Sequence, residues 1–266
     1  MSGTIWAFGG KGGSGKTTVT SLVLRRLVEA GRKPILAVDA DPNATLAMTL
    51  GVEMADTVAD LRDRMGEAAE KVTEIPKTRL MDQYLAEILA EEVGFDLLAM
   101  GRPEGPRCYC YVNGLLRRYL KELRRNYAHV LVDCEAGMEY LSRLTVDDVD
   151  TLVMVAEATP VGLRSAARIA DLADSLPVRV RRRVLVWNKV GGPGLSEEEL
   201  ARLGPPNVDA TVRIPFDADV RDRCARGLPI DAEAGPDARA AVEMLVDCCL
   251  GLEPHPTPAV EEEPLR

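Results

Sequence analysis

A glycine-rich segment at residues 10–18, with the sequence GKGGSGKTT, carries residue types that suit the binding of a phosphate chain. Its members are Gly10, Lys11, Gly12, Gly13, Ser14, Gly15, Lys16, Thr17 and Thr18. Glycines let successive backbone N–H groups turn toward one anion, and the start of a helix adds partial positive charge there. In this pattern Lys16 contacts the β- and γ-phosphates, and the Thr17 hydroxyl ligates Mg²⁺. The segment therefore predicts an ATP/ADP site, against the alternative of a glycine-rich turn that binds nothing.

Three aspartates stand where apolar stretches of strand length end. Asp39 and Asp41 close the sequence LAVDAD, and Asp133 closes VLVD. The carboxyl ends of parallel strands meet at the edge of the sheet where ligands bind. We expect Asp133 and Asp39 to serve Mg²⁺, with a switch-loop role as the alternative for Asp39, and Asp41 to position the water that attacks ATP. A helix N-cap is the competing interpretation for any one of these aspartates taken alone.

The elements that position these residues follow from the apolar pattern. Continuous apolar runs, which are typical of strands buried on both faces, occupy residues 4–8, 34–38, 96–100, 129–132, 151–155, 183–187 and 210–214. Apolar residues at helical spacing occupy residues 16–30, 111–126, 161–175, 196–203 and 237–250. The alternation predicts an α/β fold with a doubly wound, mostly parallel sheet.

Composition limits the domain organisation and the partners. We expect a single domain over residues 1–252, with an insertion at 54–94 that holds a helix near 83–92, and a disordered tail at 253–266. The 266 residues include 33 Lys and Arg against 42 Asp and Glu, a formal net charge of -9. This charge argues against nucleic-acid and membrane-surface partners. Because no apolar stretch reaches about 18 residues and no leader pattern precedes the glycine segment, we expect a cytoplasmic protein.

The second lysine of the segment, Lys11, adds a more specific signal. With it, residues 10–18 resemble the deviant P-loop of the MinD/ParA class, within the SIMIBI type of P-loop NTPases. Members of that class pair face to face. The resemblance implies a homodimer in which Lys11 reaches the partner's nucleotide and stabilises charge on the phosphoryl group in transfer.

Other segments match the same class at the places where its nucleotide contacts lie. The sequences DADP at residues 39–42 and DCEAG at residues 133–137 resemble its two switches. An Asn-Lys pair, Asn188 and Lys189, follows a predicted strand. The resemblance implies that Asn188 reads the adenine and that the segment IPFD at residues 214–217, which includes Pro215 and Phe216, packs near the base.

Six cysteines include a close pair, Cys108 and Cys110. Together with the DCEAGMEYL sequence from residue 133, this pair resembles the CooC-type ATPases, which implies nickel binding and nickel insertion into carbon monoxide dehydrogenase as the client enzyme. Two thiolates leave a four-coordinate site half filled, so a dimer would complete a Cys₄ set. Thiolates suit Ni²⁺ or Zn²⁺, and the choice between them rests on the resemblance. The competing interpretation is two ordinary thiols, or a reversible disulfide between them.

The remaining cysteines are expected to pack as small apolar residues: Cys134, Cys224, Cys248 and Cys249. Two other functions stay open at this point. One is an iron–sulfur ATPase resembling the nitrogenase iron protein, although the position of Cys134 directly after Asp133 fits that pattern poorly. The other is a partitioning ATPase on DNA or a membrane, against which the acidic composition argues.

Overall fold

The fold was analysed in a computed structural model that describes residues 3–61, 87–101, 125–134, 148–175, 178–191, 195–230 and 234–252. Within these ranges the sheet has eight strands in the order β3-β4-β2-β5-β1-β6-β7-β8. β3 runs antiparallel to β4, and the pairings that join β4 to β8 across the sheet are parallel. The predicted α/β class with a mostly parallel sheet is confirmed.

The strands other than β3 lie where the apolar runs predict them, with ends shifted or extended by one to a few residues. Their bounds are Thr4–Gly10 for β1, Ile35–Asp39 for β2, Ala90–Glu92 for β3, Phe95–Ala99 for β4, His129–Asp133 for β5, Asp148–Glu157 for β6, Arg179–Val190 for β7 and Ala210–Pro215 for β8. Residues of β1 alternate between two apolar layers, with Trp6 and Phe8 in one and Ile5 and Ala7 in the other. Both faces of the sheet are therefore covered, as its continuous apolar runs require.

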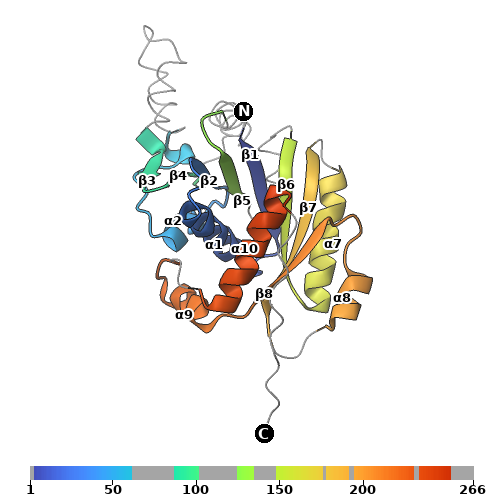
Figure 1. The fold of residues 1–266 in the computed structure, drawn as a ribbon. Helices are drawn as coiled ribbons and strands as arrows, with labels where there is room; N and C mark the ends of the chain where they lie inside the picture. Colours follow the sequence, from blue (N-terminus) through green and yellow to red (C-terminus); the bar gives the residue numbers. More distant parts are fainter. Residues whose placement is uncertain are drawn as a thin grey trace.

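Helices cover the two faces. Their bounds are Lys16–Glu29 for α1, Thr45–Leu50 for α2, Pro160–Ser175 for α7, Glu197–Leu203 for α8, Ala218–Arg226 for α9 and Pro236–Leu250 for α10. Figure 1 shows α1 and α10 side by side across one face, where they share an apolar layer with α2. The buried side of α7 and Leu200 of α8 belong to the opposite layer. The sheet is thus held between two helical layers, and its strand ends stay available at one edge.

The predicted helix near residues 83–92 is wrong over its last three residues, because Ala90–Glu92 form strand β3, whereas Glu87 and Ile88 are helical. The chain turns at Val93 and Gly94, and Glu92 then pairs with Phe95 across an antiparallel ladder. Gly94 has φ 104°, a left-handed conformation that suits glycine and permits this reversal.

Several other expectations fall on residues outside the described ranges. These are the central part of the proposed insertion, residues 62–86, most of the predicted helix at 111–126, and the tail at 253–266. The described flanks of the proposed insertion pack into the apolar layer that also holds Ile5 and Ala7, where Val58, Leu61 and Ile88 are buried. Helices α2 and α9 had no counterpart in the sequence prediction.

Candidate functional site

The glycine-rich segment forms the loop between β1 and α1, and its glycines are required by its shape. A Cβ on Gly10 would lie 2.4 Å from the carbonyl oxygen of Val155. Gly15 has φ 93°, and a Cβ there would lie 2.3 Å from Nδ2 of Asn188. The loop therefore accepts no side chain at either position, which leaves its backbone close to whatever it encloses.

The polar atoms of this loop fit a phosphate chain. The Lys16 side chain is buried, with 8% of the residue exposed, and its Nζ donates one 3.4 Å hydrogen bond to the carbonyl of Lys11. The Ser14 hydroxyl is buried and has no hydrogen-bond partner among the described residues. No side chain in the described ranges caps the start of α1, so its first N–H groups remain available to an anion. A buried ammonium, an unpartnered hydroxyl and an uncapped helix start together form an anion cradle.

Asp133 lies beside this cradle at the end of β5. Its Oδ2 accepts a 2.6 Å hydrogen bond from the Thr17 hydroxyl, and its Oδ1 accepts a 3.4 Å one from Thr20. Only 1% of Asp133 is exposed, and this burial raises the pKa of the carboxyl group to about 6, against the lowering effects of the Thr17 hydrogen bond and the Lys16 charge. The hydroxyl and carboxylate expected to serve Mg²⁺ are thus in direct contact, which fits an oxygen-ligated divalent ion.

Asp39 pairs in register with Asp133 across β2 and β5. Burial, and then the charge of Asp133, raise the pKa of Asp39 to about 7. Its Oδ1 accepts from the backbone N–H of Asp41 at 3.1 Å, and its Oδ2 accepts from Leu46 N–H in the first turn of α2 at 2.7 Å. In this structure Asp39 therefore holds the segment that carries Asp41, which agrees with the alternative switch-loop role.

Asp41 sits at the start of the turn that leads to α2. Its Oδ1 accepts hydrogen bonds from the backbone N–H and the side-chain amide of Asn43, at 2.8 and 2.9 Å. No described residue donates to its Oδ2. One carboxylate oxygen thus fixes the turn, while the other is left for a further donor.

Asn188 and Lys189, at the end of β7, hold the carbonyl side of the phosphate loop. Nδ2 of Asn188 donates to the Ser14 carbonyl at 2.9 Å. Nζ of Lys189 donates to the Gly13 carbonyl at 2.7 Å and pairs with Glu157 at 2.9 Å. These contacts orient the loop, a role that the sequence did not predict, whereas adenine recognition by Asn188 stays a prediction.

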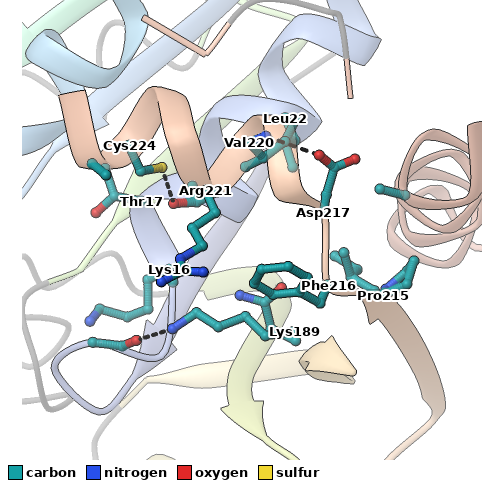
Figure 2. A pocket seen from close by; sticks show the side chains of 17 residues that line it. Lys16, Thr17, Leu22, Lys189, Pro215, Phe216, Asp217, Val220, Arg221 and Cys224 are labelled. Atoms are coloured by element: carbon teal, nitrogen blue, oxygen red, sulfur yellow. Dashed lines mark hydrogen bonds between the residues drawn. The ribbon is translucent and has the colours of Figure 1, made fainter. Parts of the chain in front are cut away.

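A cavity of about 570 Å³ opens beside the loop (Figure 2). The residues that line it come from the phosphate loop, the start of α1, the ends of β7 and β8, and α9; they include Lys16, Thr17, Thr18, Asn188, Lys189, Pro215, Phe216, Arg221 and Cys224. The cavity thus brings the predicted Asn188 and Pro215 together with the loop. Its size and its mixed polar and apolar lining are those of a small-molecule site.

Cys224 corrects one prediction, because it is exposed on α9 rather than packed in the core. Its Sγ lies 3.7 Å from Oγ1 of Thr18, at the wall of the cavity. The helix that carries it has one buried residue, Val220, so it turns most of its surface outward. Arg221, which sequence reasoning missed, reaches the cavity from the same region, as does Phe216 of the segment expected near the base. The Asp217 N-cap, three residues before Val220, was the available signal for a helix here.

The other cysteines of the described ranges behave as expected. Cys134, Cys248 and Cys249 are buried, and burial raises the pKa of the Cys134 thiol. Cys108 and Cys110 lie outside the described residues. Among the residues that the structure describes, no group of three or more His, Cys, Asp or Glu side chains is arranged to hold a metal ion. Lys11 is exposed on the loop.

None of the described helices combines the length and the apolar character that crossing a membrane requires.

Comparison with known proteins places these features in context. The family described as the CobQ/CobB/MinD/ParA nucleotide binding domain matches residues 5–230. An uncharacterised ATP-binding protein of Methanocaldococcus jannaschii is 38% identical, over 85% of this chain and 90% of that protein. The carbon monoxide dehydrogenase accessory protein CooC of Rhodospirillum rubrum is 32% identical, over 82% of this chain and 86% of that protein. Among solved structures, the MinC:MinD cell division complex of Aquifex aeolicus has a chain with a similar fold, with a TM-score of 0.69 and 22% identity over 96% of this chain and 98% of that one.

Proposed function

We propose that this chain, a P-loop ATPase that belongs to the CobQ/CobB/MinD/ParA nucleotide-binding family, works as a homodimer that couples ATP hydrolysis to nickel delivery. The observation that carries the proposal is the 32% identity to a carbon monoxide dehydrogenase accessory protein, 86% of whose length is covered. The client would be carbon monoxide dehydrogenase or a related nickel enzyme. The phosphate cradle supplies the ATPase half of this function, and Cys108 and Cys110 supply the metal half.

The cradle residues divide the work of hydrolysis among themselves. The buried Lys16 ammonium and the N–H groups at the start of α1 hold the phosphates. Thr17 and Asp133, already in contact, would hold Mg²⁺, which when bound neutralises charge on the β- and γ-phosphates. Asp39 positions the Asp41 segment through the two N–H groups that it accepts.

Asp41 orients the attacking water through the oxygen that Asn43 leaves without a donor. The water oxygen bonds to the γ-phosphorus as the bond to the β–γ bridging oxygen breaks, and the products are ADP, inorganic phosphate and a proton. Lys11, exposed on the loop, would reach the partner's nucleotide and stabilise charge on the transferring group.

Metal binding would use two thiolates from each protomer. Cys108 and Cys110 of one chain would supply two of the four ligands of a four-coordinate site. A twofold axis that brings the pairs of two chains together would supply all four. Such a site joins the protomers, so nickel loading and the closing of two nucleotide sites become events of the same interface. Zn²⁺ is the expected competitor at the same thiolates.

The burial of Cys134 argues against the iron–sulfur alternative. Its thiol is in the core, where it donates to the Val132 carbonyl at 3.8 Å, and burial raises its pKa. A cluster ligand must be a thiolate and must reach the surface that the partner protomer shares. Cys134 satisfies neither requirement in this structure.

Nickel titration by calorimetry tests the proposal on wild type, a Cys108→Ser/Cys110→Ser double variant and a Cys224→Ser control. We expect one Ni²⁺ for two chains in wild type and in the control, because Cys224 is an exposed thiol outside the pair. The double variant should lose this binding and keep its basal ATPase activity. Unchanged nickel stoichiometry and affinity in the double variant would refute nickel binding by Cys108 and Cys110, and would leave the ATPase assignment unaffected.

A further inference from the structure

Helix α9 and the residue that follows β8 bring a cation and an aromatic ring to the wall of the nucleotide cavity. Phe216 is 47% exposed although it is a large apolar side chain. The guanidinium carbon of Arg221 lies 5.8 Å from the centroid of its ring, within the range of a cation–π contact. In Figure 2 the Arg221 side chain extends from α9 toward Lys16, with its guanidinium group beside the Phe216 ring. Both side chains line the cavity.

Nearby carboxylates do not neutralise Arg221. The obvious candidate, Asp217, accepts from the N–H groups of Asp219 and Val220 with one oxygen and from Gly235 N–H with the other, at 2.7 to 3.0 Å. Within the part of the chain that the structure describes, no ion pair involves Arg221. Its neighbour Arg226, in contrast, pairs with Asp222 at 2.9 Å. Arg221 thus presents an uncompensated charge to the cavity.

The lining of the cavity is both polar and apolar. The phosphate loop and the start of α1 supply Lys16 and the hydroxyls of Thr17 and Thr18. The apolar side chains in the lining are those of Leu22, Ile214, Pro215, Val220, Ala225 and Ala238. A nucleotide with its phosphates on the loop would place its base within reach of α9 and of the segment before it, which carry Arg221 and Phe216.

We propose that Arg221 is a specificity-determining residue of the ATP site, whose planar guanidinium covers one face of the purine base and is oriented by Phe216. The proposal rests on the ATPase function and adds a base contact to it. A guanidinium is planar and weakly hydrated, so it stacks on π surfaces in a way that an ammonium group does not. Phosphate binding already has the Lys16 ammonium and the uncapped start of α1. The larger π surface of a purine should gain more from this contact than that of a pyrimidine.

The test compares Arg221→Ala with Arg226→Ala, a matched arginine on the same helix that does not line the cavity. Affinities are measured for ATP, CTP and inorganic tripolyphosphate, the last of which has the phosphates without a base. We expect Arg221→Ala to weaken ATP binding roughly ten-fold and CTP binding less. Tripolyphosphate affinity should stay unchanged, and KM for ATP should rise while kcat is preserved. Arg226→Ala should match wild type for all three ligands.

Two further variants separate geometry from charge. Arg221→Lys keeps the charge without the plane, so we expect it to recover less than half of the lost ATP affinity on a logarithmic scale. Phe216→Leu should weaken ATP binding. The Phe216→Leu/Arg221→Ala double variant should lose less ATP-binding free energy than the two single variants lose in sum, because the two side chains act together. Circular dichroism and thermal unfolding of each variant check that α9 remains folded.

Each failure has a distinct meaning. Equal weakening of ATP and tripolyphosphate by Arg221→Ala would assign the residue to the phosphates and overturn the proposal. Unchanged ATP affinity, or full recovery by lysine, would overturn it too. A wild-type protein that fails to hydrolyse ATP would refute the ATPase mechanism itself, whereas normal hydrolysis with an indifferent Arg221→Ala variant would refute the base contact alone.

Discussion

Replacement of Asp133 by asparagine isolates the cost of the buried carboxylate beside the phosphate loop. The side chain is 1% exposed and lies opposite Asp39 in the β2–β5 ladder. Asparagine retains an oxygen to accept from the Thr17 hydroxyl, and its amide can donate to the oxygen of Thr20, which now approaches at 3.4 Å. Asp133→Asn therefore removes the charge and keeps the local hydrogen bonds.

The magnitude follows from the pKa. Burial raises the pKa of Asp133 from 3.8 to about 6. The folded state then holds the proton more tightly than the unfolded state, so the free energy of unfolding falls as pH rises from about 4 to about 6 and is level above that. The full effect is about 3 kcal/mol, and about half of it is already lost at pH 5. Asp133→Asn should thus stabilise the protein by about 3 kcal/mol at pH 8 and by about half of that at pH 5.

Urea unfolding followed by circular dichroism measures this difference, in EDTA and without nucleotide so that no bound ligand masks it. Asp174→Asn is the control, because Asp174 is exposed and its hydrogen bond to Arg183 lowers its pKa. Stability from a lowered pKa is lost only as pH falls toward that pKa, so the control should show no slope between pH 5 and 8. An equal effect of Asp133→Asn at pH 5 and pH 8 would refute the assignment of the cost to the buried charge.

Two other substitutions test how the site is held. Gly15→Ala should destabilise the protein by about 2 kcal/mol and weaken ATP binding, because it places a Cβ in a left-handed conformation against Asn188; unchanged thermal unfolding and ATP affinity would contradict this. Arg25→Ala should cost about 1–2 kcal/mol in urea unfolding, because the guanidinium donates to the carbonyls of Leu50 and Ile230 at 2.7 and 3.4 Å; an effect no larger than that of a surface arginine such as Arg226→Ala would count against it.

The sheet was predictable because its parallel strands are buried on both faces. That environment makes a strand such as β5 continuously apolar, and the pattern is visible without any tertiary information. The sequence did not predict β3, because its three residues, Ala-Glu-Glu, have no continuous apolar run. They pair with β4 across the turn at Gly94. α9 was not predicted for a related reason, because Val220 is its one buried residue and the helix therefore shows no apolar face. Its N-cap Asp217 also accepts from the N–H of the distant Gly235.

The same distinction runs through the site. Residues 10–18 act through backbone geometry and local spacing, so their sequence predicts the cradle. The contacts of Asn188 and Lys189 with the loop carbonyls depend on β7 lying in register beside β6, which spacing along the chain does not encode. Arg221 reaches the cavity only because α9 begins after β8 and turns that side chain inward. Residues at the ends of predicted strands, such as Asp133 beside Thr17, could thus be brought together from the sequence, whereas the side-chain contacts of Asn188, Lys189 and Arg221 could not.

Helix α2 connects the α9 side of the cavity to the turn that carries Asp41. The segment that follows α9 meets the end of α2, where Ile230 N–H donates to the Thr49 carbonyl at 2.8 Å. Arg25, from α1, donates to the carbonyls of both segments at this junction, those of Leu50 and Ile230.

α2 is in turn held at its start by Asp39, and Asp41 lies just before it. A movement of α9 and a movement of the Asp41 turn would therefore act on opposite ends of the same six-residue helix. We expect so short a helix to move as one body and so to pass a displacement from one end to the other. Arg25→Ala, which loosens one end, should for this reason affect ATP hydrolysis as well as stability, although Arg25 does not line the cavity.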